Sequence, residues 1–237
     1  MESDIKFRHV VIDENPPGAH HDILLLADLT KNGLPDVIIG GKLGDVNLFW
    51  YENPGWKRHS IAVAPNLEAG GWVADIAGNG RPDIVAGQSG GALSKELYWF
   101  ECPEDPTRPW VKRLIVDRYK KYHDQIVADI NGDGKPEVIF ISQKAGVLCI
   151  CEIPPDPRVS PWPEQYIHVA AEGIFDVEGL AVVDIDGDGR LEIVTGMHIF
   201  HAQGDPLNEP WRIETYAGDY TMAHVAVADL DGDGKLD

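Results

Sequence analysis

Oxygen-bearing side chains recur at alternate positions of a short turn in this sequence of 237 residues. In the segment DIDGDGRLEIV they are Asp184, Asp186, Asp188 and Glu192. Calcium takes about six to eight oxygen ligands, which alternating carboxylates supply, and Gly189 permits the sharp turn. A helical calcium-binding hand needs a glutamate at loop position twelve, which is Thr195 here. The short, β-branched flanks instead predict a calcium loop between two strands.

Four further segments repeat this loop at intervals of about 45 to 55 residues, a period typical of repeat proteins. All five loops have glycine at position six. The other candidate calcium ligands are Asp28, Thr30, Asn32 and Asp36 in loop one, Asp75, Asn79 and Asp83 in loop two, Asp129, Asn131, Asp133 and Glu137 in loop three, and Asp229, Asp231, Asp233 and Asp237 in loop five.

The five loops differ in the ligands that they offer. Loops three, four and five have full ligand sets, and we expect them to bind Ca²⁺ as a structural ion. Loop one has Thr30 and Asn32 in place of carboxylates, so we expect weaker binding. Loop two has Ala77, which offers no ligand, and we expect the backbone and Asn79 to hold its shape. The alternative, favoured only for loop two, is an Asx-type turn without an ion.

Each of the four complete repeats contains four strand-like segments, and no segment has a helical period. In repeat two they read GWVAD, DIVAGQ, ELYWFECP and WVKRLIVD. The first is nearly all apolar, which predicts burial on both faces, and the fourth alternates as an outer strand does. The pattern predicts an all-β fold, a β-propeller of four-stranded antiparallel blades with the loops between strands one and two. The expected repeats of this single domain, 1–237, are about 20–63, 68–117, 121–171, 176–217 and, in part, 221–237.

The N-terminal segment 5–13, which includes FRHVVID, matches the fourth strand of the repeats but precedes the first of them. We expect it to complete the last blade of a closed ring, whose remaining strands would follow loop five. The sequence is therefore interpreted as an incomplete propeller, truncated after Asp237, whose intact form has at least five blades, with or without a further C-terminal domain.

Composition limits the partners and the compartment. The net charge of −19 comes mostly from the loop acids, and a chain of this balance lacks the basic patches that nucleic acids require. No apolar run approaches the length of a membrane span, and no hydrophobic signal segment opens the chain, so we expect a cytoplasmic protein, or a secreted one whose leader is missing. Cys149 and Cys151 favour core packing over a zinc site, and the three cysteines suggest no disulfide framework.

The loops, the third strands FWYENPG and YWFECPEDP, and the outer strands WKRHSI and WVKRLIV resemble FG-GAP or VCBS-type propeller repeats over nearly the whole chain. HHDILLLADLT, YHDQIVADINGDG and the aromatic third strands look most like the propeller of the aldos-2-ulose dehydratase family. This resemblance implies dehydration of sugar-derived ketones such as 1,5-anhydrofructose, with cupin domains after the propeller. Calcium-containing polysaccharide lyases with similar propellers are the nearest neighbours.

A histidine-rich face is expected at the end of the blades opposite the loops. Strands one and two run antiparallel, so the start of one and the end of the other lie together there. Six of the nine histidines fall at these positions: His20, His21, His123, His198, His201 and His224. The candidate catalytic residues on this face are His21, Asp22, His123, Asp124, Glu178, His224, Gln143 and Lys42. Gly70 and Gly71 are expected to leave space for a substrate.

Imidazole and carboxylate groups can act as acid or base near neutral pH, and they also suit zinc or manganese. A lyase or dehydratase needs a base, an orienting carboxylate and a group that stabilises an enolate. We expect His123 or His21 to be the base or a metal ligand. Asp22, Asp124 and Glu178 would orient or ligate, and Gln143 and Lys42 would hold sugar hydroxyls or an oxyanion. The alternative is that these residues cap strand ends.

Two classes of function remain open. One is an enzyme domain, a carbon–oxygen lyase acting on a small-molecule or oligosaccharide substrate. The other is a non-catalytic propeller that binds a carbohydrate or a protein partner, as integrin-type FG-GAP propellers do. His–Asp pairs at one end of the blades favour the enzyme. The aromatics Trp50, Tyr51, Trp99 and Phe100 could stack on sugars, but their place in third strands favours packing between blades.

Overall fold

The computed structural model describes residues 7–64, 66–90, 95–218 and 222–237. Sixteen strands in this part of the chain form four separate antiparallel sheets of four strands each. The single helical element there is a 3₁₀ turn, Glu164–Tyr166. No helix among these residues is long and apolar enough to span a membrane. The predicted all-β fold with four-stranded antiparallel blades is confirmed.

The strands of each sheet follow one another in chain order. Blade one contains β1 (Ile23–Ala27), β2 (Asp36–Gly40), β3 (Leu48–Glu52) and β4 (Lys57–Ala62). Blade two contains β5 (Trp72–Ala74), β6 (Asp83–Gly87), β7 (Leu97–Glu101) and β8 (Val111–Val116). Blade three contains β9 (Tyr122–Ala128), β10 (Glu137–Ser142), β11 (Val147–Glu152) and β12 (Ile167–Glu172). Blade four contains β13 (Ala181–Val183), β14 (Glu192–Val194), β15 (His198–Ala202) and β16 (Trp211–Thr215).

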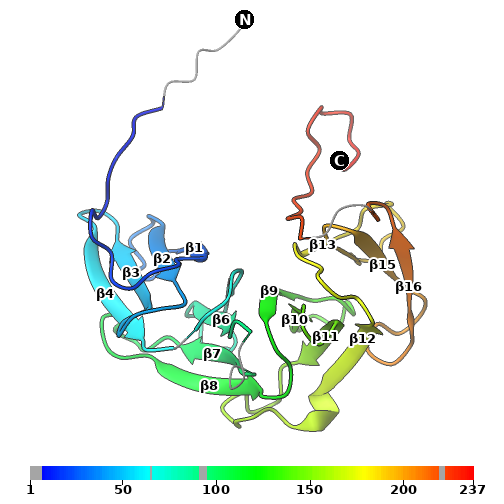
Figure 1. Ribbon diagram of the computed structural model, residues 1–237, viewed down its shortest axis with the longest axis horizontal. Coiled ribbons are helices and arrows are strands. Elements are labelled where there is room, and N and C mark those ends of the chain that lie inside the picture. The colour runs from blue at the N-terminus through cyan, green and yellow to red at the C-terminus, as the bar shows by residue number, and fades with distance from the viewer. Residues whose placement is uncertain (1–6, 65, 91–94, 219–221) are drawn as a thin grey trace, which may run out of the picture.

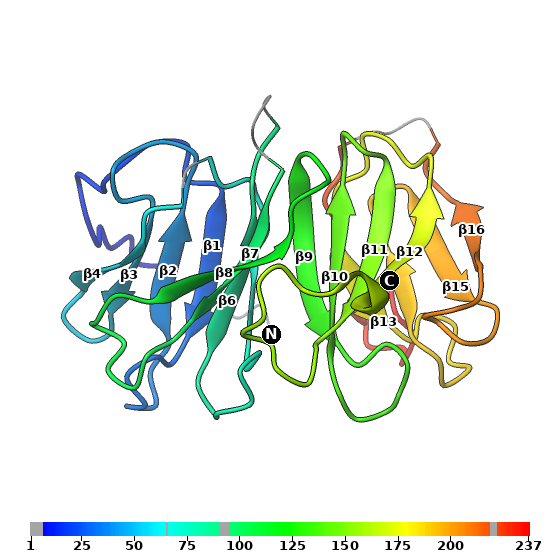
Figure 2. The ribbon, with the colours of Figure 1, turned by 90° about the horizontal axis from the view of Figure 1, so that it is seen from below.

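The four sheets stand side by side around an open arc (Figure 1). The first strand of each blade lies on the inner side of the arc and the fourth on the outer side, and β9 contacts both β5 and β13. Figure 2 shows the same sheets from the outside of the arc. Because strands one and two are joined by the acidic loops, all four complete repeats place these loops at one end of the blades.

The hydrophobic core lies between neighbouring blades rather than within any one blade. Successive side chains of a strand point to opposite faces of its sheet. On β7, Phe100 therefore packs toward blade one, together with Trp50, while Trp99 packs toward blade three, together with Phe140. All four rings are fully buried. This confirms the expectation that the third-strand aromatics serve packing between blades.

Burial of the first strands differs from the expectation. Leu24 and Leu26 of β1 are 69% and 61% exposed, whereas Ile23 on the same strand is buried against blade two. In blade three, by contrast, the first five residues of β9 are buried. The physical reason is position in the arc, because blade one has a neighbouring blade on only one side among the described residues. The apolar sequence therefore predicted the strand correctly but did not predict whether both of its faces are buried.

The segment 7–13 forms no strand, although Asp13 accepts hydrogen bonds from the Tyr51 hydroxyl (2.7 Å) and the Arg58 guanidinium (2.8 Å). Residues 5 and 6 of the expected closing strand, and residue 221 of repeat five, lie outside the described residues. Ring closure and the repeat boundaries remain predictions. The three cysteines are free and buried, with Cys149 and Cys151 in the core between blades two and three.

Candidate functional site

Each acidic loop is shaped by its first aspartate. In loop four, Asp184 Oδ1 accepts the backbone N–H of Asp188 (3.0 Å) and Oδ2 accepts that of Gly189 (2.9 Å). The first aspartates of the other loops, Asp28, Asp75, Asp129 and Asp229, accept the same two N–H groups. Gly189 has φ +88°, a conformation that glycine adopts without strain. The turn is therefore defined by the chain itself.

The acid at loop position nine ties the loop to its second strand. Glu192 Oε2 accepts the N–H of Ile185 (3.1 Å), and the equivalent acids of loops one, three and five make the same bond, whereas Asp83 of loop two accepts the N–H of Ala77 (2.9 Å). In loops one and two the second carboxylate oxygen is also used, because Asp36 and Asp83 accept the N–H groups of Asn53 and Cys102. Those acids have less capacity left for an ion, in keeping with the weaker binding expected of loop one and the ion-free turn favoured for loop two.

Loops four and five bring carboxylates together as a calcium site requires. One oxygen from each member of the sets Asp184, Asp186 and Asp188, and Asp229, Asp231 and Asp237, lies within 4.8 Å of the others. In loop three, burial raises the pKa of Glu137 to about 7, and the nearby charges of Asp133 and Asp129 add to the shift. A donor set made only of oxygens, crowded in this way, fits a hard cation such as Ca²⁺.

A second cluster lies at the opposite end of the strands, around His123 on β9. The ring Nδ1 is 2.7 Å from Asp124 Oδ2, and Nε2 is 3.1 Å from Glu178 Oε1. Gln143 donates its side-chain N–H to the same Glu178 oxygen (2.7 Å), and the N–H of Gly179 donates to Asp124 (2.9 Å). The imidazole is thus held between two carboxylates that the neighbouring blade fixes in place.

The charge state of His123 follows from these contacts. Burial alone would lower the pKa of His123, but the hydrogen bond and charge of Asp124 and the charge of Glu178 outweigh it and raise the pKa. With a carboxylate on each ring nitrogen, both nitrogens are placed to donate a proton. The arrangement therefore suits a general acid better than a base or a metal ligand.

A lysine forms the second charged group at this end. Lys42 Nζ lies 2.9 Å from Asp22 Oδ2 and 2.8 Å from Glu68 Oε1. Burial would lower the pKa of Lys42, but its bonds to both carboxylates raise it. Glu68 is buried and also accepts a hydrogen bond from the Ser89 hydroxyl (2.6 Å). Sequence reasoning missed Glu68, although it is the one acid in the loop that precedes Gly70 and Gly71.

Both groups line one open pocket of about 610 Å³. Its polar wall contains Asp22, Lys42, Glu68, His123, Asp124 and His224. The ring of His224 lies 5.8 Å from that of His123, centroid to centroid. Glu178 and Gln143 lie behind His123, buried, and support it. A polyhydroxylated small molecule in this pocket would meet two imidazole rings, an ammonium and three carboxylates.

Comparison with known proteins identifies the repeats. A family model described as FG-GAP-like repeat matches residues 28–86 and 129–195, more than half of the chain. The chain belongs to the FG-GAP-like repeat family. A curated relative, aldos-2-ulose dehydratase of Phanerodontia chrysosporium, is 28% identical over 146 residues. The match covers 52% of this chain and 16% of that protein, so the chain corresponds to only a small part of the relative.

The FG-GAP-like chain brings most, but not all, of the predicted site residues together. His21 is exposed, with Nε2 2.8 Å from the Pro17 carbonyl oxygen and its ring edge-on to Phe49, and it does not line the pocket. His201 was expected on the histidine-rich face, which is wrong, because its ring lies beside Glu192 of loop four. The error arose because β15 runs back toward the loops, so only its first residue, His198, stays near the predicted end.

The paired glycines of this FG-GAP-like chain have a backbone role. Gly70 and Gly71 have φ of +91° and +90°, where other residues are strained. A Cβ atom at Gly70 would lie 2.4 Å from the His123 carbonyl oxygen. Both glycines line the pocket, and that they leave space for a substrate stays a prediction. Gly70 also lets the loop before β5 approach the backbone that carries His123 and Asp124, whereas Gly71 lies beside Ile23 and Val85.

Proposed function

We propose that this FG-GAP-like chain is a carbohydrate-active domain of the dehydratase or lyase type that acts on sugar-derived substrates at the His123 pocket. The observation that carries the proposal is the placement of His123 between Asp124 and Glu178, beside Lys42 in one open pocket. The name of the relative, aldos-2-ulose dehydratase, supports the dehydratase class of reaction. Because the match covers only 16% of that protein, the substrate is part of the proposal.

The proposed chemistry is the elimination of water from a hydroxy ketone. A carboxylate removes the proton on the carbon next to the carbonyl, and Asp22, the more exposed partner of Lys42, is placed for this step. The Lys42 ammonium stabilises the enolate oxygen that forms. The His123 imidazolium then donates its proton to the departing hydroxyl, the carbon–oxygen bond breaks, and water leaves. Asp124 and Glu178 orient the ring, and Gln143 orients Glu178.

We propose that the acidic loops hold calcium as part of the frame, in loops three to five and more weakly in loop one. Ca²⁺ there would cross-link the two strands that each loop joins. Residues already turned toward one another by backbone bonds need little rearrangement to bind it. The calcium ions take no part in the proposed reaction, because the loops and the pocket lie at opposite ends of the strands.

The test is turnover of an aldos-2-ulose by the purified chain, followed by the ultraviolet absorbance of the enone product, with an oligouronate as a second substrate. We expect His123→Gln to lower kcat by about 10² to 10⁴-fold, the usual contribution of a general acid. His198→Ala is the matched control, since His198 contacts Thr215 and lies outside the pocket. Equal loss in both variants would contradict the proposed role of His123.

A non-catalytic carbohydrate-binding propeller is the second candidate. It is favoured by the fact that every charged group around His123 already has a partner, as in a strand cap. Sugar binding by calorimetry without turnover of either substrate would select it. Adding Zn²⁺ or Mn²⁺ to the assay tests the further possibility of a metal at this face, since only a metal-dependent enzyme would gain activity.

A further inference from the structure

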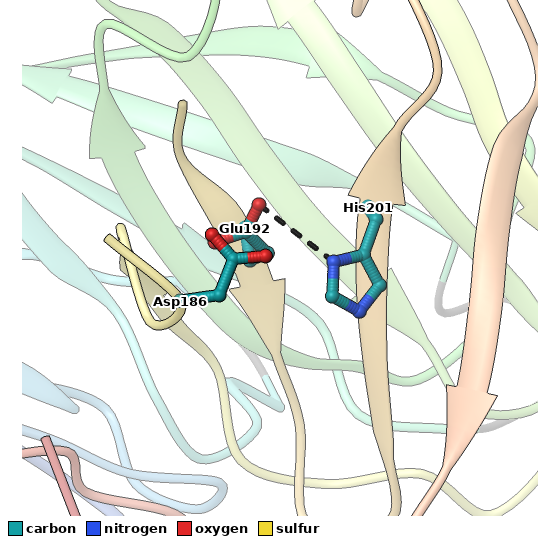
Figure 3. Close-up of side chains that lie close together, drawn as sticks. All are labelled: Asp186, Glu192 and His201. Atoms are coloured by element: carbon teal, nitrogen blue, oxygen red, sulfur yellow. Dashed lines mark ion pairs between the residues drawn. The ribbon is translucent and has the colours of Figure 1, made fainter. Parts of the chain in front are cut away.

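A histidine adjoins the acidic loop of blade four. Asp186, Glu192 and His201 each place one ligand atom within 4.8 Å of the others. Figure 3 shows the three side chains directed toward one another from loop four, β14 and β15. His201 Nδ1 is 3.8 Å from Glu192 Oε1. Glu192 is buried, and only 12% of the His201 side chain is exposed.

The other blades carry a carboxylate where blade four carries His201. By the register of the second and third strands, the residues beside the position-nine acids are Glu52, Glu101 and Glu152. Each forms an ion pair with a base on the outer strand, His59, Arg113 or His168. In blade four the order is reversed, with His201 on the third strand and Glu214 on the fourth. Blade four therefore directs an imidazole at its loop.

The His201 ring lacks good hydrogen bonds. Its Nε2 is buried without a hydrogen-bond partner, although Glu214 Oε2 lies 3.4 Å away. Its Nδ1 is too far from Glu192 for a hydrogen bond. Nε2 faces Glu214, so Nδ1, which faces Glu192 without a hydrogen bond, is the nitrogen open to a further partner. The two nearby carboxylates make a cation the fitting one.

We propose that Asp186, Glu192 and His201 form a site for a first-row divalent metal of the zinc type, which distinguishes loop four from the other loops. The inference deepens the proposed metal-binding role of the loops. Calcium binds through oxygen, whereas an imidazole nitrogen with two carboxylates suits Zn²⁺. Three protein ligands leave one position of a tetrahedral ion for water. Among the four complete repeats, only this one has both an acid at loop position three and a histidine on its third strand.

The geometry needs a modest closure. Ligand atoms about 2.0–2.2 Å from a tetrahedral ion lie about 3.4 Å apart. The ligand atoms of Asp186, Glu192 and His201 lie within 4.8 Å of one another, so they must move closer together to bind such an ion. Asp186 is exposed, and its Oδ1 accepts the N–H of Asp188 (3.2 Å), while Glu192 is anchored through Oε2 to the N–H of Ile185 and presents Oε1 to the site. The charge of Glu214 on the far side of the ring favours donation of an electron pair by Nδ1.

The experiment is titration of the chain with Zn²⁺ in excess Ca²⁺ by calorimetry, with Co²⁺ absorption as a report of tetrahedral nitrogen and oxygen ligation. We expect one Zn²⁺ to bind despite the calcium. His201→Glu, which installs the residue of the other blades, should weaken zinc binding by about tenfold or more and abolish the cobalt spectrum. His198→Ala, three residues away on the same strand, should change neither the zinc affinity nor the cobalt spectrum.

Two results would overturn the proposal: no zinc binding while calcium binds the loops, or zinc binding that His201→Glu leaves unchanged. Failure of the loops to bind either metal would instead overturn the proposed calcium frame together with this site. Circular dichroism of His201→Glu checks that the variant folds. Should it fail to fold, Asp186→Asn, which alters an exposed loop residue, is the second variant and should weaken zinc binding to a similar extent.

Discussion

The His123 imidazole is bound by a carboxylate on each nitrogen, and this has a consequence for stability. Because the pKa of His123 is raised in the folded chain above the usual histidine value of about 6.5, its ionised form is favoured by folding. That contribution is fully present below pH 6.5 and is lost as the pH rises through the higher folded pKa.

We therefore predict that the stability advantage of the native chain over His123→Gln is largest below about pH 6.5 and declines as the pH rises above that value. Urea unfolding in calcium-containing buffer at several pH values measures it. A constant difference across that range would show that His123 contributes packing rather than charge. His168→Gln serves as a control that removes a half-buried pair with a single carboxylate, His168–Glu152.

The glycine pair before β5 permits a test matched within the same chain. Gly70→Ala places a Cβ 2.4 Å from a carbonyl oxygen at φ +91°, whereas Gly33→Ala, at φ +83°, meets nothing within 4 Å. We predict that both variants lose stability through backbone strain of about 1 to 3 kcal/mol, and that Gly70→Ala loses more. The difference in urea unfolding midpoint between Gly70→Ala and Gly33→Ala measures the cost of the close approach of residue 70 to the His123 carbonyl oxygen. Equal losses would contradict it.

At the scale of elements, the acidic loops differ in how many carboxylate oxygens remain available to bind an ion. Asp184→Asn removes a carboxylate from a loop that groups three acids, while Asp75→Asn alters a loop whose position-nine acid, Asp83, is already used by two N–H groups. A ligand that binds only the folded state stabilises it by about 2.7 kcal/mol at one hundred times its Kd.

We predict that added Ca²⁺ raises the Tm of the native chain and of Asp75→Asn by similar amounts, and that it raises the Tm of Asp184→Asn by less. Thermal unfolding in calcium and in chelator gives the comparison. Both substitutions weaken hydrogen bonds to two backbone N–H groups, and Asp184 accepts a third from Gly187, so each variant is compared with itself in chelator. A calcium response that is equal in all three proteins would argue against binding at loop four.

The strands themselves were predictable because period-two patterning and turn residues act locally. All four strands of every complete repeat form, including β15, whose sequence HIFHAQG is the least regular. Burial was less predictable, since Leu24 and Ile23 have the same character and opposite exposure. That difference depends on which blade lies alongside, which the residues of one strand do not encode.

At the scale of the whole molecule, the site was predicted in part. Antiparallel pairing sufficed to bring Asp22, Lys42, His123 and His224 to one pocket. It did not identify Glu68, whose link to Lys42 crosses between blades, nor the place of His201, which depends on how far β15 runs toward the loops. Contacts between repeats are set by blade packing, so the pattern within one repeat carries little information about them.

The placement of the core between blades also bears on cooperativity. Each sheet shares its apolar surface with its immediate neighbours and with no distant part of the described chain. Such a molecule behaves as a one-dimensional array in which stability is held by nearest-neighbour couplings. Among the described residues, blades two and three each share a core with a blade on both sides, whereas blades one and four each share a core with a single blade. The His123 cluster, on blade three with Glu178 from the loop before β13, spans the contact that joins blade four to blade three.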